Sequence, residues 1–281
     1  MNAVKPTLWF FALLAWGLLI FFAFGNYYPV FDGAADVAGR IALAAILLAA
    51  TLLFRRNGRL RPYWLLPFGF FAALAALSID YYLGLSKWIL PALGIVPDTP
   101  AGLAIDKLES SLLGAAVVLL VNWAFGNSLG SLFWRPGRLW LGLGVGLGVM
   151  IAVLLILIPF TEFSFKGRDL TWQRIIPWLP WVFMFVLANA FNEEILYRGL
   201  FLGKYQPLVG AFAANLAIAI PFTLAHAPTG YASDQLLFLG ATLLAALAWG
   251  WLMQKTQSLW GSVLFHAALD IPIAVGIFSA F

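Results

Sequence analysis

Long apolar stretches, separated by short polar or Gly/Pro-containing segments, make up almost the whole chain. A transmembrane helix needs about 20 consecutive, mostly apolar residues. The segment 85–102 is interrupted by Pro and Gly, which is typical of an interfacial or re-entrant segment, so eight and nine spans both fit the pattern. The nine predicted spans are residues 7–25, 38–54, 63–84, 108–126, 139–160, 176–204, 209–227, 234–254 and 258–280.

Composition supports an integral membrane protein. Of the residues, 63% are hydrophobic and only 10% are charged, and the mean hydropathy is +0.94, which is outside the range of soluble domains. We therefore predict an all-α, polytopic integral membrane protein with about eight or nine transmembrane helices and an intramembrane polar cavity. No long-period repeat is visible, so one compact membrane domain is expected. Within it, residues 1–170 have no assigned role and residues 171–281 carry the polar motifs described below.

The distribution of charge predicts how the chain lies in the membrane. Lys and Arg gather in alternate connecting segments, with a cluster at 55–61, and the positive-inside rule then places the N-terminus in the cytoplasm. With nine spans the C-terminus lies outside. The first apolar run is longer than a signal-peptide core and predicts a retained helix. A pI near 9.4 reflects these topology signals, so membrane lipid is the expected partner and nucleic acid is not.

Two glycine-rich motifs have structural explanations. GLGVGLG (142–148) lacks the preceding strand and the spacing of a nucleotide-binding loop, and its overlapping GxxxG pairs indicate close helix packing. GNSLG (126–130) matches the GxSxG pattern of serine hydrolases, but without a strand before Ser128 it predicts a helix end and a turn.

Ionisable residues gather in the last four spans, which include both histidines of the chain. One charge at a helix centre costs about 2.5–3.5 kcal/mol, so four unpaired charges would cost on the order of 10 kcal/mol. They must therefore pair with one another or line a hydrated cavity, and such residues are candidates for function. The candidates are Glu193, Glu194, Arg198, His226, His266 and Asp270.

Helical spacing predicts how the acidic residues are divided. Glu194 and Arg198 are four residues apart, so they stack on one helix face in the favourable order for a salt bridge. Glu193 is rotated by about 100° from Glu194, so it faces another neighbour and is free to act as a base. Glu193 reaches the depth of His226 only if the helix continues past Arg198 towards Lys204.

The histidines follow a similar pattern. His266 and Asp270 are also four residues apart, so Asp270 can fix the tautomer of the ring or join it around a metal or a water. His226 comes after Pro221, which removes a backbone hydrogen bond and can open a polar pocket. Separate packing pairs explain each residue singly, but explain poorly why all six gather in the last spans.

Three motifs in order resemble one family. EEILYR (193–198) resembles the EExxxR motif, FTLAH (222–226) resembles FxxxH, and SLWGSVLFHAALD (258–270) resembles the third motif, which ends in HxxxN or HxxxD. Together they are similar to the CPBP family of intramembrane proteases, named for CAAX prenyl endopeptidases and bacteriocin-processing or immunity proteins and also called Abi. The resemblance covers about residues 176–280.

The resemblance implies a helical membrane protease whose motif residues meet in a membrane-embedded cavity. Carried onto this chain, Glu193 and His226 would activate the attacking water, and His266 with Asp270 would stabilise the oxyanion or complete a metal site. The prenyl proteases have Asn where this chain has Asp270. An ionised aspartate cannot donate a hydrogen bond, so Asp270 must be protonated for an oxyanion role and otherwise holds His266.

The cofactor is left open by the residues. Glu193, His226 and His266 match the ligand set of a catalytic zinc or another divalent metal, and the same residues also suit a metal-free glutamate protease. In either case the resemblance implies that Glu194 and Arg198 orient the site.

The substrate and two other functions also stay open. The basic loops and the lack of cysteine suggest a bacterial inner-membrane protein, for which a signal, leader or membrane peptide is a better substrate than a lipidated CAAX protein. A non-proteolytic scaffold or immunity protein would keep the motifs as structure. A proton-coupled transporter would use them as a proton relay, although the inverted repeats common in transporters are not visible.

Overall fold

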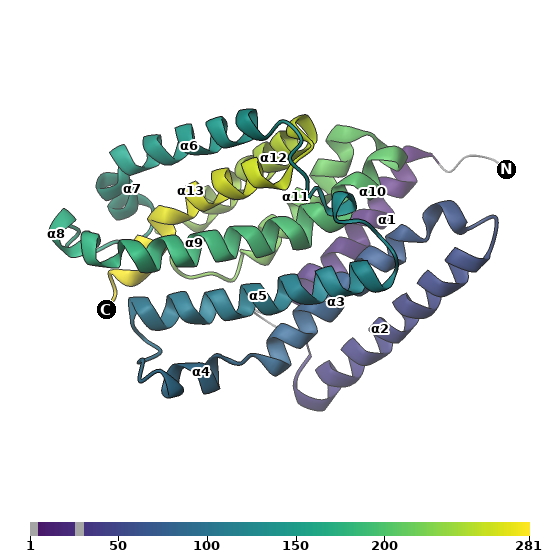
Figure 1. Ribbon diagram of the computed structural model, residues 1–281, viewed down its shortest axis with the longest axis horizontal. Helices are drawn as coiled ribbons and strands as arrows, with labels where there is room; N and C mark the ends of the chain where they lie inside the picture. The colour runs from purple at the N-terminus through teal and green to yellow at the C-terminus, as the bar shows by residue number, and fades with distance from the viewer. Residues whose placement is uncertain (1–4, 26–30) are drawn as a thin grey trace.

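The computed structural model describes residues 5–25 and 31–281, and these residues form helices and connecting segments without a strand (Figure 1). Three 3₁₀ turns, Arg61–Tyr63, Leu129–Leu132 and Ile176–Trp178, lie between or before longer helices. The first helix ends in a π-helical turn, η1 (Leu19–Ala23), and a second π-helical turn, η5 (Glu194–Gly199), joins α9 to α10. The α-helices are α1 (Pro6–Leu18), α2 (Gly33–Arg56), α3 (Leu65–Leu83), α4 (Ser86–Ala92), α5 (Pro100–Ala124), α6 (Leu139–Leu155), α7 (Leu157–Ser164), α8 (Trp172–Ile175), α9 (Leu179–Glu193), α10 (Leu200–Val209), α11 (Ala211–Ala225), α12 (Gln235–Thr256) and α13 (Leu259–Phe278).

The helices confirm the predicted fold class. Each of the nine predicted spans overlaps a helix, and six helical stretches in the described part are long and apolar enough to cross a membrane, or seven if α6 and α7 count as one bent span. α11 is apolar but has only 15 residues. The count of eight or nine spans therefore stays a prediction, as does the orientation in the membrane.

Proline and a helix cap account for the largest differences between predicted and observed helix bounds. α5 begins at Pro100, before the predicted start at residue 108, because the Thr99 hydroxyl accepts a hydrogen bond from the Gly102 N–H and Pro100 occupies the first turn. The predicted span 139–160 is broken at Ile156, where α7 turns by 79° from α6. Pro159 explains the break, since its ring would clash with the carbonyl of Leu155 in a continuous helix.

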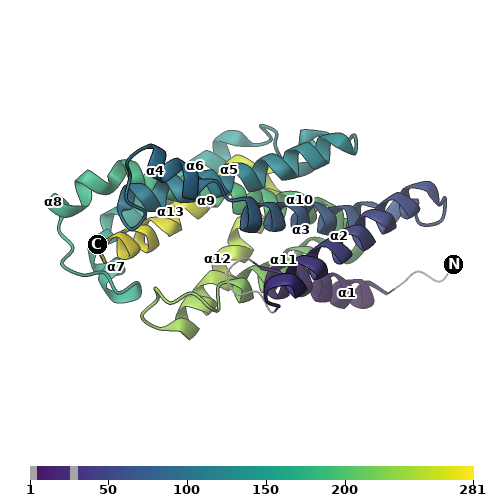
Figure 2. The same ribbon diagram turned by 90° about the horizontal axis from the view of Figure 1, so that it is seen from below.

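Two layers of helices enclose the polar motifs. In one layer α3, α5, α9, α13 and α6 lie in this order, each in contact with the next, and α2 packs on α3 at the edge. A second layer contains α1, α11 and α12, which Figure 2 shows below the first. Its contacts with α10 and α13 join the layers. The candidate residues on α9, η5, α11 and α13 therefore meet between them.

Large apolar side chains on the outside of the described part fit a lipid environment. Exposed residues of this kind include Phe11, Ile41, Trp140, Leu155 and Leu244. A soluble monomer rarely exposes so much apolar surface, whereas hydrocarbon chains cover it in a bilayer.

Close packing of α6 on α13 depends on glycine, as GLGVGLG predicted. A Cβ atom at Gly261 would lie 2.4 Å from the Cα of Gly142, and one at Gly146 would lie 2.8 Å from the Cβ of Leu264. A Cβ at Gly144 would meet nothing within 4 Å. GNSLG is the predicted turn, where the Asn122 amide donates to the carbonyl oxygens of Asn127 and Ser128.

Replacing Gly261 with alanine should lower the melting temperature of the purified protein, because the added methyl group forces α6 and α13 apart. Overpacking of this kind costs about 1–3 kcal/mol, more than the roughly 1 kcal/mol that alanine gains over glycine in a helix. The matched change Gly144→Ala should leave the melting temperature unchanged or raise it. Thermal unfolding in detergent, followed by circular dichroism, measures both. Equal melting temperatures for the two variants would contradict the glycine contact.

Candidate active site

A single helical stretch carries the EEILYR motif through the centre of the molecule. It runs from Trp172 to Val209, 38 residues, and includes α9, η5 and α10. The helix therefore continues past Arg198, as the predicted depth of Glu193 requires. Its π-helical turn begins at Glu194, and the i→i+5 hydrogen bonds of such turns are frequent at functional sites.

One oxygen atom of Glu194 holds two cationic or proton-donating partners. Glu194 Oε1 accepts a hydrogen bond from Arg198 Nη1 at 2.7 Å and another from His266 Nδ1 at 2.9 Å. The side chains of Glu194 and Arg198 have no exposed surface, and that of His266 is only 2% exposed. Because Nδ1 faces a carboxylate, it must carry a proton, so Glu194 fixes the orientation and the tautomer of the ring. The predicted salt bridge is confirmed.

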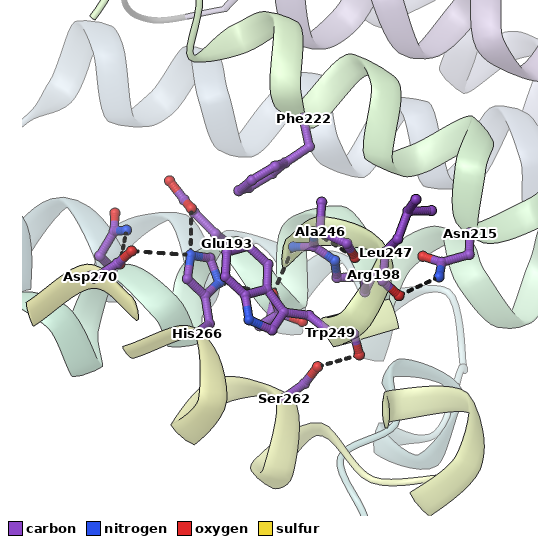
Figure 3. A network of polar contacts seen from close by, with 12 residues as sticks. Glu193, Arg198, Asn215, Phe222, Ala246, Leu247, Trp249, Ser262, His266 and Asp270 are labelled. Atoms are coloured by element: carbon purple, nitrogen blue, oxygen red, sulfur yellow. Dashed lines mark hydrogen bonds and ion pairs between the residues drawn. The ribbon is translucent and has the colours of Figure 1, made fainter. Parts of the chain in front are cut away.

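The other ring nitrogen of His266 faces two carboxylates (Figure 3). Nε2 lies 3.4 Å from Glu193 Oε2 and 3.6 Å from Asp270 Oδ1, both longer than an ordinary N–H···O hydrogen bond. Glu193 Oε2 is buried and accepts no hydrogen bond. If Nε2 carried only a lone pair, both carboxylates would repel it. The arrangement therefore favours a proton on Nε2 or a water that bridges Nε2 and the carboxylates.

Asp270 is held by a residue that the motifs do not include. The Asn189 side-chain amide donates to Asp270 Oδ2 at 2.9 Å. With one oxygen bound to this donor and the other facing His266, Asp270 lies where it can hold the histidine ring in place. Asn189 lies four residues before Glu193, so the helical spacing that paired Glu194 with Arg198 could have identified it.

His226 lies at the end of α11 and lines the same cavity as His266 and Asp270. Its Nδ1 is 2.8 Å from the Phe222 carbonyl oxygen, which only accepts, so Nδ1 donates and Nε2 keeps a lone pair. The cavity has a volume of about 140 Å³. Glu193 on α9 and His266 on the neighbouring α13 face each other within the first layer. The joint action of Glu193 and His226 on a water stays a prediction.

Aromatic rings close the site on the side of α11 and α12. Trp249 stacks on the His266 ring with centroids 3.7 Å apart and an angle of 13° between the planes. The Arg198 guanidinium lies 4.5 Å from the Phe222 ring centroid and 5.1 Å from that of Trp249. Cation–π contacts of this kind stabilise a cation that has lost its water. No spacing rule pointed to Trp249, which lies between the second and third motifs in sequence.

The predicted metal ligands are not assembled. In the part of the chain that the structure describes, no three His, Asp or Glu side chains are placed to hold a metal ion. Of the predicted set, Glu193 and His266 are neighbours, while His226 faces the carbonyl of Phe222. Metal dependence stays a prediction.

The fold and the site define a helical membrane protein with a buried cluster of acids, bases and one arginine. Residues 175–272 match the family model described as type II CAAX prenyl endopeptidase, Rce1-like, which confirms the resemblance that the three motifs predicted. Over this segment the chain is therefore similar to membrane proteases of the CAAX endopeptidase type. No protein of curated function and no solved structure is significantly similar to it. The division at residue 170 stays a prediction.

Arg198→Met should strongly destabilise the protein, because it leaves the buried Glu194 carboxylate without its cation. Breaking a buried ion pair in this way costs about 3–5 kcal/mol. The double variant Glu194→Gln/Arg198→Met removes both charges and should recover part of the lost melting temperature. Arg56 is exposed, so Arg56→Met is the matched control and should change little. A double variant less stable than Arg198→Met would contradict the pairing.

Proposed function

We propose that this protein is an intramembrane endopeptidase that hydrolyses a peptide bond of a membrane-associated protein or peptide, with Glu193 as the base. The observation that supports this role is the buried Glu193 Oε2, which accepts no hydrogen bond and faces His266 Nε2 at 3.4 Å. Because this carboxylate oxygen accepts no hydrogen bond from the protein, it is available to accept a proton from a bound water.

The proposed reaction uses water in the cavity that His226, His266 and Asp270 line. One proton of the water passes to Glu193, and the water oxygen bonds to the carbonyl carbon of the substrate. The lone pair on His226 Nε2 accepts the other hydrogen of the water and so orients it. Glu193 then returns its proton to the amide nitrogen as the C–N bond breaks. The products are a carboxylic acid and an amine.

His266 and Asp270 are proposed to stabilise the oxyanion of the tetrahedral intermediate. Protonated at both nitrogens, His266 would donate Nε2–H to the oxyanion, and the carboxylates of Glu194 and Asp270 would stabilise that imidazolium. Glu194 and Arg198 contact the ring or each other rather than the cavity, so their proposed role is to orient His266. Trp249 limits rotation of the ring by stacking on it.

The cavity indicates an apolar substrate. It shares Phe160, Phe165, Phe238 and Ala241 with a second cavity of about 430 Å³ that extends between α7 and the start of α12. A peptide segment with apolar side chains next to the scissile bond fits these walls. We therefore propose signal, leader or other membrane peptides as substrates, with lipidated proteins as the second candidate.

Glu193→Gln should abolish cleavage, because the amide has nearly the shape of the carboxylate but cannot accept the proton. Loss of one general base typically costs 10²–10⁴-fold in rate. Comparing membrane and secreted peptides by mass spectrometry, between cells with the wild type and cells with the variant, measures the loss and identifies the substrate.

Glu162→Gln is the matched control. Glu162 is exposed on α7, so this variant should cleave normally. Both variants must reach the membrane in equal amounts. Identical peptide patterns for wild type and Glu193→Gln would overturn the proposal, and a phenotype without any change in peptides would instead favour a scaffold.

We expect cleavage by the purified protein to persist after dialysis against a chelator, because the predicted ligands do not converge in the structure. Activity before dialysis, after dialysis and after addition of zinc is compared on the peptide identified above. Loss on dialysis with recovery on zinc would show that the ligands rearrange around a metal.

A further inference from the structure

A further cavity, separate from these two, lies at one end of the helix layers, apart from the candidate active site. Its volume is about 650 Å³, and its walls come from the start of α3, the segment between α5 and α6, α10 and the turn between α12 and α13. Two connecting segments and the ends of two helices therefore meet around it. These connections belong to the segments that the positive-inside rule placed in the cytoplasm.

Lys204 gives this cavity a side-chain amine whose nitrogen atom is buried and unpaired among the described residues. Its Nζ atom is inaccessible to solvent and has no hydrogen-bond partner among the described residues, although the side chain lines the cavity. A buried ammonium without a partner is strongly unfavourable, because it has lost its water and gained no opposite charge. A bound anion would supply the missing partner.

Arg135 adds a second cation to the same wall. Its Nε donates to the Gln257 carbonyl oxygen at 3.0 Å and its Nη2 donates to the Gln257 side chain, which hold the guanidinium in place. A guanidinium has five N–H donors, so these bonds leave others for a ligand. No acidic residue is among the described residues that line the cavity. The cavity is therefore complementary to an anion.

The apolar walls of the cavity favour a ligand that carries a hydrocarbon part as well as a negative charge. Leu65, Leu66, Pro207 and Leu208 line the cavity beside the two cations. An inorganic anion would leave these walls without a partner, whereas an amphiphile would place its charged group at Lys204 and its hydrocarbon along them. The ends of membrane-spanning helices are also where lipid headgroups lie.

We propose that this cavity binds the phosphate group of an anionic phospholipid, with Lys204 as the main contact and Arg135 as the second. Lysine and arginine are the side chains that most commonly bind phosphate groups. The lipid would tie α3, α10 and the turn between α12 and α13 together. This site is independent of the proposed protease activity, since Lys204 lies ten residues after Glu194 and contacts none of its partners.

The test is thermal unfolding of the delipidated protein in a neutral detergent, with and without added phosphatidylglycerol. At a lipid concentration about 100 times the Kd, the melting temperature of the wild type should rise by roughly 5–10 °C. The Lys204→Met variant should lose this rise. Without lipid, the melting temperature of the variant should equal or exceed that of the wild type, because the substitution removes a buried, unpaired amine. Lys204→Arg should keep the rise.

Controls separate the headgroup from other sources. Lys255→Met removes an exposed lysine outside this cavity and should keep the lipid effect. Diacylglycerol with the same acyl chains but no phosphate should give no rise. A rise of equal size with inorganic phosphate would overturn the lipid in favour of a free phosphate site. No rise with phosphatidylglycerol, or a rise that Lys204→Met retains, would overturn the site itself.

Discussion

The site depends on one carboxylate oxygen, Oε1 of Glu194, which neutralises Arg198 and binds His266 at the same time. In the hydrocarbon core no water is available to hydrogen-bond these groups, so each needs a partner inside the protein. Because the oxygen is shared, the arginine and the histidine are held at fixed positions relative to each other. The aromatic rings of Phe222 and Trp249 then cover the guanidinium and the imidazole, replacing lost hydration with cation–π and stacking contacts. The cost of burying charge is thus what makes the site rigid.

A rigid His266 decides what its neighbours can do. With Nδ1 committed to Glu194, only Nε2 is available for chemistry, and it faces Glu193 and Asp270. These two carboxylates are not equivalent, since Asn189 binds Asp270 while Glu193 Oε2 accepts no hydrogen bond. This difference is the basis of the proposed roles, in which Glu193 is the base and Asp270 only holds the ring. The Nζ atom of Lys204 presents the opposite case, since it is buried and no described residue supplies a partner, which is the basis of the proposed lipid site.

The sequence predicted those features of the fold that depend on the residues of a single helix. Nine apolar runs each overlap a helix, and GLGVGLG predicted close helix packing, which Gly142 makes with Gly261 between α6 and α13. The misplaced bounds arise from local chemistry that a hydropathy pattern does not include. Thr99 and Pro100 begin α5 early, and Pro159 breaks the span at Ile156. Thr99, Pro100 and Pro159 are visible in the sequence, but the predicted bounds followed the apolar runs alone.

The sequence by itself determined the contacts within one helix, because a spacing of four residues places two side chains on the same face. Glu194 with Arg198 and His266 with Asp270 are such pairs. Only the tertiary structure decided that Glu194 also binds His266, which is 72 residues away, that Glu193 faces His266, and that Trp249 stacks on the ring. These contacts depend on how α9, α12 and α13 pack against one another. No periodicity within a single helix specifies the relative rotation of two helices.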